Sequence, residues 1–129
     1  MSAFSDALSV TSGGLMSQAA RLRVVSENIA NVDTPGYHRK LLSFDVTKDD
    51  SSLSRVEPGD VDLSRVPLDE VYDPSHPLAD ETGRYLGSNV DLMIELADAR
   101  EAQRSYEANL KMFDQTRQMS SALLDLLRR

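Results

Sequence analysis

Residues 89–129 read NVDLMIELADAREAQRSYEANLKMFDQTRQMSSALLDLLRR, and their apolar residues recur at alternating spacings of three and four. This periodicity is typical of one face of an α-helix. The main row comprises Leu92, Leu96, Ala99, Tyr106, Leu110, Phe113, Leu124 and Leu127. A second row beside it comprises Met112, Met119, Leu123 and Leu126. Because one partner helix cannot cover both rows, the segment predicts a long helix that packs against more than one neighbour.

The N-terminal end carries a similar but narrower pattern. The residues that recur every seven positions are Leu8, Leu15, Leu22 and Ile29, with Phe4 and Val25 on the flanking row. This pattern predicts a helix from about Ala3 to Asn31, and we expect it to pack with the C-terminal helix as an antiparallel coiled coil. A simple helical hairpin with its own core would show the same periodicity. At ~1.5 Å per residue, however, the C-terminal helix would approach 60 Å and overhang its partner by a few turns, which favours contacts with other chains.

The middle of the chain predicts a small, irregular β unit. Pro35 cannot continue the first helix, and Gly36 tolerates the positive φ of a type II turn. A strand is predicted over 37–47 and a loop over 49–54, and Pro58-Gly59 is expected to interrupt the strands that follow. The further strand candidates are 61–63, 68–72 and 82–87, and Ser88 or Asn89 is expected to cap the last helix. The predicted fold is therefore mainly α, with paired terminal helices (1–34 and 89–129) and a β-rich or loop segment (35–88) whose part 47–70 could be flexible.

Charge is concentrated in this middle segment. The chain has 129 residues and a formal net charge of −7. Residues 45–91 contain four basic and twelve acidic groups, whereas both ends are close to neutral. Neutral ends can approach one another without long-range repulsion, and an acidic middle is either a solvated loop or an ordered loop that faces a partner. The sequence has no stripe of basic residues, so binding to nucleic acid is not expected.

Cysteine usage and hydropathy limit the possibilities further. The chain has no cysteine, so it contains neither a disulfide nor a thiolate metal site. We find no apolar run long enough to span a bilayer and no secretory signal at the first residues, so direct membrane insertion is not expected.

Two motifs resemble a known family. The first comprises Ser26-Glu27-Asn28-Ile29-Ala30-Asn31 and Thr34-Pro35-Gly36-Tyr37, and it resembles the signature of the axial proteins of the bacterial flagellum, namely rod, hook and hook-associated subunits. The second begins at Val71-Tyr72-Asp73-Pro74 and continues through Asn89-Val90-Asp91 to Arg104-Ser105-Tyr106-Glu107-Ala108-Asn109. It narrows the resemblance to the proximal rod proteins of the basal body. The resemblance covers both ends and residues 71–91 and fades across 47–70.

The residues that carry the resemblance form our candidate family motif: Asn28, Ile29, Ala30, Asn31, Thr34, Pro35, Gly36, Tyr37, Asn89, Val90, Asp91, Arg104, Tyr106 and Asn109. The candidate packing residues are Leu8, Leu15, Leu22, Ile29, Leu92, Leu96, Tyr106, Leu110, Phe113, Met119, Leu123 and Leu127. The chain departs from the family pattern at Ser88, where Pro is common, and at the doubled Gly13-Gly14. We expect each glycine to loosen the first helix by roughly 1 kcal/mol relative to alanine.

The resemblance implies a structural role without a chemical step. Such proteins are exported by the flagellar type III apparatus without a cleaved signal and assemble in the periplasmic rod, which transmits torque from motor to hook. The implied partners are copies of the chain, other rod proteins, and export-apparatus or rod adaptor proteins. Two alternatives remain open, namely another axial protein such as the sister proximal rod subunit, and a soluble helical-hairpin interaction module.

Catalysis has one weak candidate. Asp73, His76 and Asp80 have the atom types of a metal or acid–base site, but prolines lie between them and no further histidine or glutamate cluster supports them. His38, beside Arg39 and Lys40, is interpreted as a surface histidine. We therefore assign no catalytic, cofactor-binding or metal-binding residue.

Overall fold

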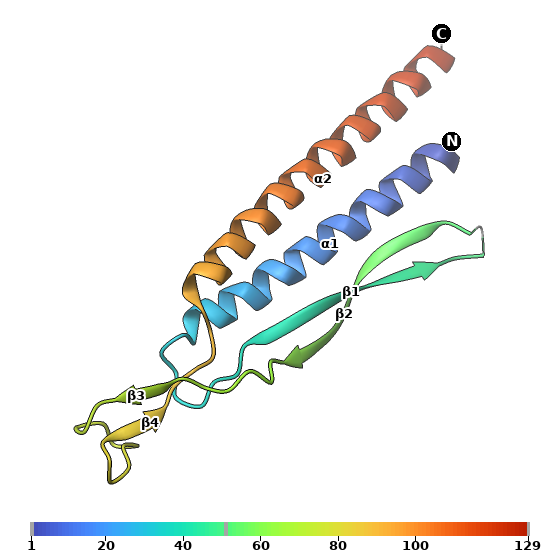
Figure 1. Ribbon diagram of the computed structural model, residues 1–129. Coiled ribbons are helices and arrows are strands. Elements are labelled where there is room, and N and C mark those ends of the chain that lie inside the picture. Colours follow the sequence, from blue (N-terminus) through green and yellow to red (C-terminus); the bar gives the residue numbers. More distant parts are fainter. Residues whose placement is uncertain (1, 51, 129) are drawn as a thin grey trace.

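A computed structural model describes residues 2–50 and 52–128 (Figure 1). The elements in chain order are α1 (Ser2–Ala30), β1 (Lys40–Lys48), β2 (Ser54–Leu63), β3 (Glu70–Tyr72), β4 (Arg84–Leu86) and α2 (Leu92–Leu127). The prediction of two long terminal helices with a small β part between them is confirmed. Both predicted helices begin and end within a few residues of the observed ones.

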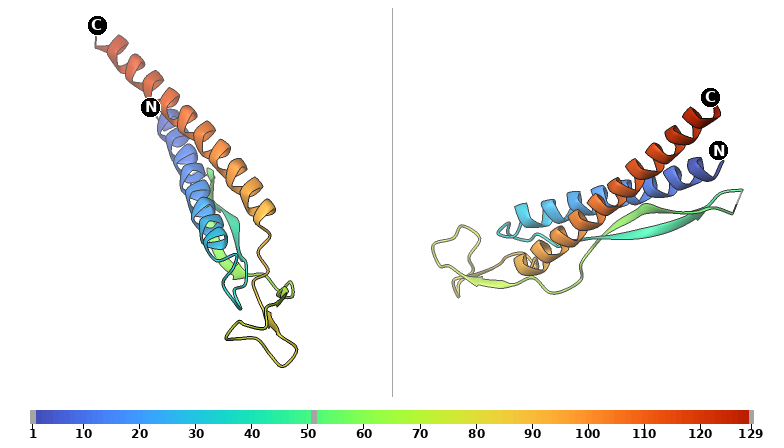
Figure 2. Two further views of the ribbon diagram at one scale, coloured as in Figure 1. Left: turned by 90° about the vertical axis from the view of Figure 1, so that its left-hand side faces the viewer. Right: turned by 90° about the horizontal axis from the view of Figure 1, so that it is seen from above.

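The molecule is elongated, with α1 in its middle layer. α2 packs along one side of α1 in the opposite direction, and the β1–β2 ribbon runs along another side of α1 (Figures 1 and 2). Among the described residues, α1 is the element whose backbone lies closest to α2, and no strand backbone approaches α2 to the same degree. With 36 residues against 29, α2 is longer by about 10 Å, and its C-terminal end extends past α1 as predicted (Figure 1).

The β1–β2 ribbon is longer than the sequence predicted. β2 begins at Ser54 and continues through Pro58-Gly59, where we expected an interruption. The antiparallel register pairs Leu42 with Val61 and Phe44 with Pro58, so the strand accommodates Pro58 beside a β-bulge. A Cβ atom on Gly59 would lie 2.8 Å from Ser43 Oγ, which explains why glycine occupies this crowded position.

The β3–β4 hairpin lies at the end of the molecule opposite the chain termini (Figure 1). Its antiparallel register pairs Val71 with Tyr85, and each strand has only three residues. The predicted ranges 68–72 and 82–87 are therefore right in position and too long. Gly83, with φ +80°, allows the turn that precedes β4.

The doubled glycine in α1 has a packing role that the sequence did not reveal. A Cβ atom on Gly13 would lie 2.7 Å from the carbonyl oxygen of Val56 in β2. A Cβ atom on Gly14 would lie 2.9 Å from Oδ1 of Asn109 in α2. Each glycine thus permits close approach of a different neighbour, and the two together let α1 pack against both layers.

The buried core is small and unusually polar. The buried hydrophobic residues are Val24, Val25, Val90 and Ala102, and the buried polar residues are Ser17, Asn28, Ser64, Ser88 and Glu95. Buried polar groups are costly unless they are hydrogen-bonded, so the partners of these side chains decide how the fold is held together. Neither α1 nor α2, over the residues that the structure describes, has the length and hydrophobicity that a membrane-spanning helix needs.

Candidate assembly surfaces

Asn28 lies at the centre of a hydrogen-bonded junction between the end of α1 and the start of β1. Its side chain is 1% exposed. Nδ2 donates to the carbonyl oxygen of Lys40 at 3.0 Å, and Oδ1 accepts from the amide of Lys40 at 2.9 Å and from the hydroxyl of Tyr37 at 2.8 Å. Burial raises the pKa of Tyr37, in keeping with its role as a hydrogen-bond donor. Asn28 therefore replaces a strand partner for β1 and fixes the turn between the two elements.

Asn89 makes comparable hydrogen bonds in the segment that leads into α2. Its Oδ1 accepts the amide of Arg39, and its Nδ2 donates to the carbonyl of Val66 at 2.8 Å. Its own amide donates to the carbonyl of Tyr37 at 3.3 Å. The neighbouring Ser88 hydroxyl donates to the carbonyl of Val32. Segments that are far apart in the sequence are thus joined through side-chain amides and hydroxyls.

The remaining residues of the N-terminal motif shape the turn itself. Asn31 Nδ2 donates to the carbonyl of Glu27 at 2.8 Å, and the Thr34 hydroxyl donates to Asn31 Oδ1 at 3.0 Å. Gly36 has φ +75°, and its amide donates to the carbonyls of Leu86 and Gly87 at 3.3 and 3.1 Å. The motif therefore ends α1 and connects the turn to β4. We call Asn28, Tyr37, Arg39, Lys40, Ser64, Ser88, Asn89 and Glu95 the junction.

The cap of α2 differs from the prediction. Asp91, and neither Ser88 nor Asn89, is the N-cap, and its carboxylate accepts the amides of Met93 at 3.0 Å and Ile94 at 3.5 Å. The physical reason is that Ser88 and Asn89 already use their side chains in the junction. The helix accordingly begins at Leu92.

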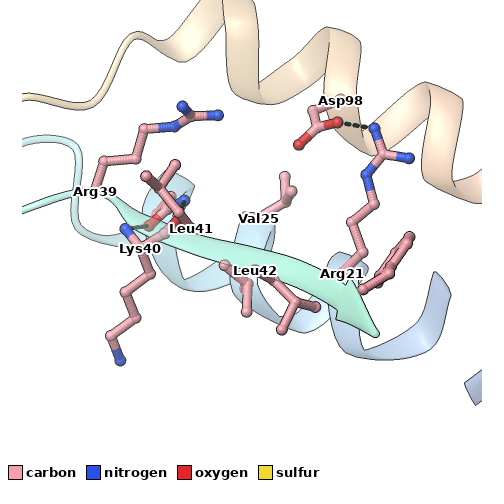
Figure 3. A pocket seen from close by; sticks show the side chains of 10 residues that line it. Arg21, Val25, Arg39, Lys40, Leu41, Leu42 and Asp98 are labelled. Atoms are coloured by element: carbon pink, nitrogen blue, oxygen red, sulfur yellow. Dashed lines mark hydrogen bonds and ion pairs between the residues drawn. The ribbon is translucent and has the colours of Figure 1, made fainter. Parts of the chain in front are cut away.

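Ion pairs tie α1, α2 and β1 together around a shallow cavity (Figure 3). Arg39 pairs with the fully buried Glu95 of α2, Arg21 of α1 pairs with Asp98, and Lys40 pairs with Glu27 at 2.7 Å. The cavity has a volume of about 310 Å³, and Val25, Leu41 and Leu42 form part of its apolar lining. Because each cation beside it has its own carboxylate, the cavity does not present a free charge for an anionic ligand.

The face between the two helices differs from that of an ordinary amphipathic hairpin, in which large apolar residues dominate the contact. The face of α2 that packs on α1 is rich in small and polar residues, including Ala102, Ser105, Asn109 and Thr116. The predicted main row does not lie together on this face: Tyr106 and Phe113 are half-buried, whereas Leu92, Leu96 and Leu110 are 41–43% exposed. Small residues allow the helices to approach closely beside Tyr106 and Phe113, whereas Leu92, Leu96 and Leu110 lie to one side of this face.

Large apolar side chains remain exposed at the start of α2 and along its C-terminal half. The exposed residues of this kind are Leu92, Met93, Ile94, Leu96, Leu110, Met112, Met119, Leu123, Leu124, Leu126 and Leu127. In α1, the predicted Leu8, Leu15, Leu22 and Ile29 are half-buried, and the most buried positions are Ser17, Val24, Val25 and Asn28. Clusters of exposed apolar side chains of this kind mark interaction sites.

The other motif residues lie along α2. Asn109 Nδ2 donates to the carbonyl of Ser105 at 3.0 Å and lies against Gly14, while Arg104 is exposed. The family motif is thus divided between the junction and the middle of α2. The junction partners Arg39, Ser64 and Glu95 were missed by sequence reasoning, although a glutamate on the apolar side of a predicted helix was a signal for a buried ion pair.

The Asp73, His76 and Asp80 group does not form a metal site. Asp73 accepts from the Ser75 hydroxyl at 2.6 Å and Asp80 from the Thr82 hydroxyl at 2.6 Å; these hydrogen bonds lower the pKa of both carboxyls. His76 stacks on Tyr85, with ring centroids 3.9 Å apart. Across residues 2–50 and 52–128, no group of three or more histidine, aspartate or glutamate side chains could hold a metal ion. His38 Nδ1 lies 3.2 Å from the carbonyl oxygen of Ser64 and so contacts the junction.

Comparison with known proteins points to the bacterial flagellum. Residues 8–38 match the family "Flagella basal body rod protein", and residues 81–126 match "Flagellar basal body rod FlgEFG protein C-terminal". The chain is 42% identical to the flagellar basal-body rod protein FlgC of Agrobacterium fabrum, with 99% of this chain and 98% of that protein covered. It is 32% identical to the FlgC of Aquifex aeolicus, covering 88% and 90%, and 31% identical to that of Bacillus subtilis, covering 98% and 99%.

Proposed function

Because the chain belongs to the FlgC family of flagellar basal-body rod proteins, and so is a structural subunit of the rod, we propose that it is built into the rod through the exposed apolar rows of α2. The exposed leucines and methionines of α2 are the observation that carries this proposal. They would be costly in an isolated soluble chain and become favourable when neighbouring helices remove them from water. Rod neighbours would thereby provide the apolar core that the single chain lacks.

The proposal includes a division of roles within the chain. Residues 1–34 and 89–129 form the axial core, whose helices pack with neighbouring helices in the manner of a coiled coil. Residues 35–88 form the β-containing middle part, in which 47–70 is the segment that the family resemblance does not cover. The packing residues are Leu8, Leu15, Leu22 and Ile29 in α1 and, in α2, the outward-facing leucines and methionines together with Tyr106 and Phe113.

The proposed partners are copies of the chain, other rod proteins, and adaptor proteins of the export apparatus. Export through the flagellar type III apparatus would deliver the chain to the rod in the periplasm, where the rod transmits torque from motor to hook. The absence of a chemical step is consistent with relatives that are named as rod proteins. The half-buried His76, stacked on Tyr85, has a structural role in this proposal.

The test is genetic and structural. In a strain of the source bacterium that lacks this chain, we expect non-motile cells whose purified basal bodies show the membrane ring but no completed rod in electron micrographs. Expression of the chain, or of its His76→Ala variant, should restore rods and swimming. Normal rods without the chain would contradict the proposal and favour a soluble interaction module. Rods restored equally by the sister proximal rod protein would contradict the specific assignment.

A further inference from the structure

The two histidines of the chain use the same ring nitrogen in opposite ways. His76 Nδ1 accepts the backbone amide of Leu78 at 3.1 Å, so this nitrogen carries no proton and the ring is neutral. His38 Nδ1 lies 3.2 Å from the carbonyl oxygen of Ser64, which can only accept, so this nitrogen carries a proton. Protonation of the ring therefore preserves the contact of His38, whereas at His76 it sets a new N–H against the N–H of Leu78.

The bond from Leu78 to His76 closes a turn in the loop between β3 and β4, at the end of the molecule opposite the chain termini (Figure 1). His76 is half-buried and stacks on Tyr85 of β4, with the two rings 14° from parallel. Leu78, at the end of the turn, lines a cavity together with Pro35 and Gly36 of the N-terminal motif. The imidazole thus connects β4 to a turn that reaches the segment after α1.

We propose that His76 is a pH-sensitive contact of the hairpin: the neutral ring holds the 76–78 turn closed, and the protonated ring releases the Leu78 amide. Histidine gains its second proton between about pH 8 and 5, and the resulting cation has two donors and no acceptor. The stack on Tyr85 persists, because a cation is attracted to the face of an aromatic ring. The ring therefore stays on β4 while the turn opens and frees Leu78 to leave Pro35. This behaviour belongs to the single chain and does not require assembly into the rod.

The other charges near the ring stay constant over the same range of pH. Asp73, in the same loop, interacts electrostatically with His76 and favours the cation. Asp80 and Arg84 line the cavity beside Leu78. Hydrogen bonds to their carboxylates lower the pKa of both aspartates, and arginine keeps its proton throughout. A change at Leu78 between about pH 8 and 5 therefore reports on His76.

Two variants of the full chain define the closed and the open turn. In His76→Asn, Oδ1 can accept the same amide in an Asx turn and does not titrate, so the turn should stay closed at every pH. In His76→Ala the acceptor is missing, and the turn should be open. In NMR spectra of the parent chain, we expect the Leu78 amide signal to lie near that of His76→Asn at about pH 8 and to move most of the way to that of His76→Ala by about pH 5. Its midpoint should coincide with that of the His76 ring signals.

Two further variants serve as controls. His38→Asn should leave the titration of the Leu78 amide unchanged. Asp73→Asn should preserve this titration and move its midpoint to lower pH, because the charge that favours the cation is gone. A Leu78 amide that does not move over this range, or that moves equally in His76→Asn, would overturn the proposal. Neither result bears on the rod assignment, which the strain lacking the chain tests separately.

Discussion

The junction and the outward side of α2 solve the problem of burial in opposite ways. At the junction, Asn28 and Glu95 are at most 1% exposed. Asn28 binds the backbone of Lys40 and the hydroxyl of Tyr37, and Glu95 pairs with Arg39 through Oε1, while its Oε2 has no hydrogen-bond partner among the described residues. Near the C-terminal end of α2, Leu126 and Leu127 are 66% and 73% exposed. Buried polar side chains thus fix the internal geometry of the chain, whereas many of its large apolar side chains stay exposed for contact with neighbours. In a subunit of an assembly, these two regions can be disrupted separately.

A charge on the outward side should abolish motility without unfolding the chain. Leu110→Asp places a carboxylate where the proposal has an apolar contact, at a cost of several kcal/mol to assembly. Because Leu110 is already 41% exposed, we expect the free energy of unfolding of the isolated chain to fall by only about 1–2 kcal/mol. Swimming assays and urea denaturation measure the two effects.

Two further variants are compared with Leu110→Asp. Leu110→Met, which keeps the volume, should swim normally. Phe113→Asp, at a half-buried position against α1, should lose both motility and stability. A Leu110→Asp strain that swims as well as the parent would show that the exposed rows are not assembly surfaces.

Replacing Asn28 should have the opposite pattern of effects: the main loss should be in the free energy of unfolding of the chain. Asn28→Ala leaves the amide of Lys40 and the hydroxyl of Tyr37 without their partner, and we expect a loss of about 3 kcal/mol in the free energy of unfolding. Asn31→Ala is the matched control, because Asn31 is only half-buried; its loss should stay below about 1 kcal/mol. Equal losses in urea denaturation would mean that the junction does not govern stability.

The contrast between these regions also explains what the sequence could predict. Periodicity placed both helices correctly, because helical spacing depends on local pattern alone. It also identified apolar rows on α2 but could not tell which residues would face α1. The structure assigns that face to Ala102 and Asn109, whose small or polar side chains carry little weight in a hydrophobic pattern.

Errors in the middle segment have a shared physical cause. Pro58-Gly59 was interpreted as a strand break, yet a bulge accommodates both residues within β2. Ser88 and Asn89 have good capping chemistry, but long-range hydrogen bonds engage their side chains first. In each case a tertiary contact, absent from local sequence, overrides the local preference.

The two glycines of α1 should respond differently to the same change. Alanine is favoured over glycine in a helix by roughly 1 kcal/mol. At Gly13 the new Cβ meets a backbone oxygen of β2, which cannot move without shifting the strand, so Gly13→Ala should destabilise the chain by about 1–2 kcal/mol. At Gly14 it meets the movable side chain of Asn109, so Gly14→Ala should remain within about 0.5 kcal/mol of the parent. Thermal unfolding of the two variants, compared side by side, checks the prediction; equal shifts in Tm would contradict it.

The smallest effect concerns pH and the β3–β4 hairpin, a region that is neither buried like the junction nor apolar like the outward side of α2. Hydrogen bonds from Ser75 and Thr82 lower the pKa of Asp73 and Asp80. A carboxyl whose folded pKa is lowered stabilises the fold fully above its unfolded pKa, about 3.9, and loses that contribution as pH falls through the folded value. The amide NMR signals of Ser75 and Thr82 should therefore shift with midpoints below the ordinary aspartate range.

The amide of Ser64, which donates to the backbone carbonyl of Arg39, should not follow the same titration. Asp73→Asn and Asp80→Asn should each abolish the titration of the local amide alone. A coincident titration of all three amides would instead indicate global acid unfolding, and the hairpin would then have no separate dependence on pH.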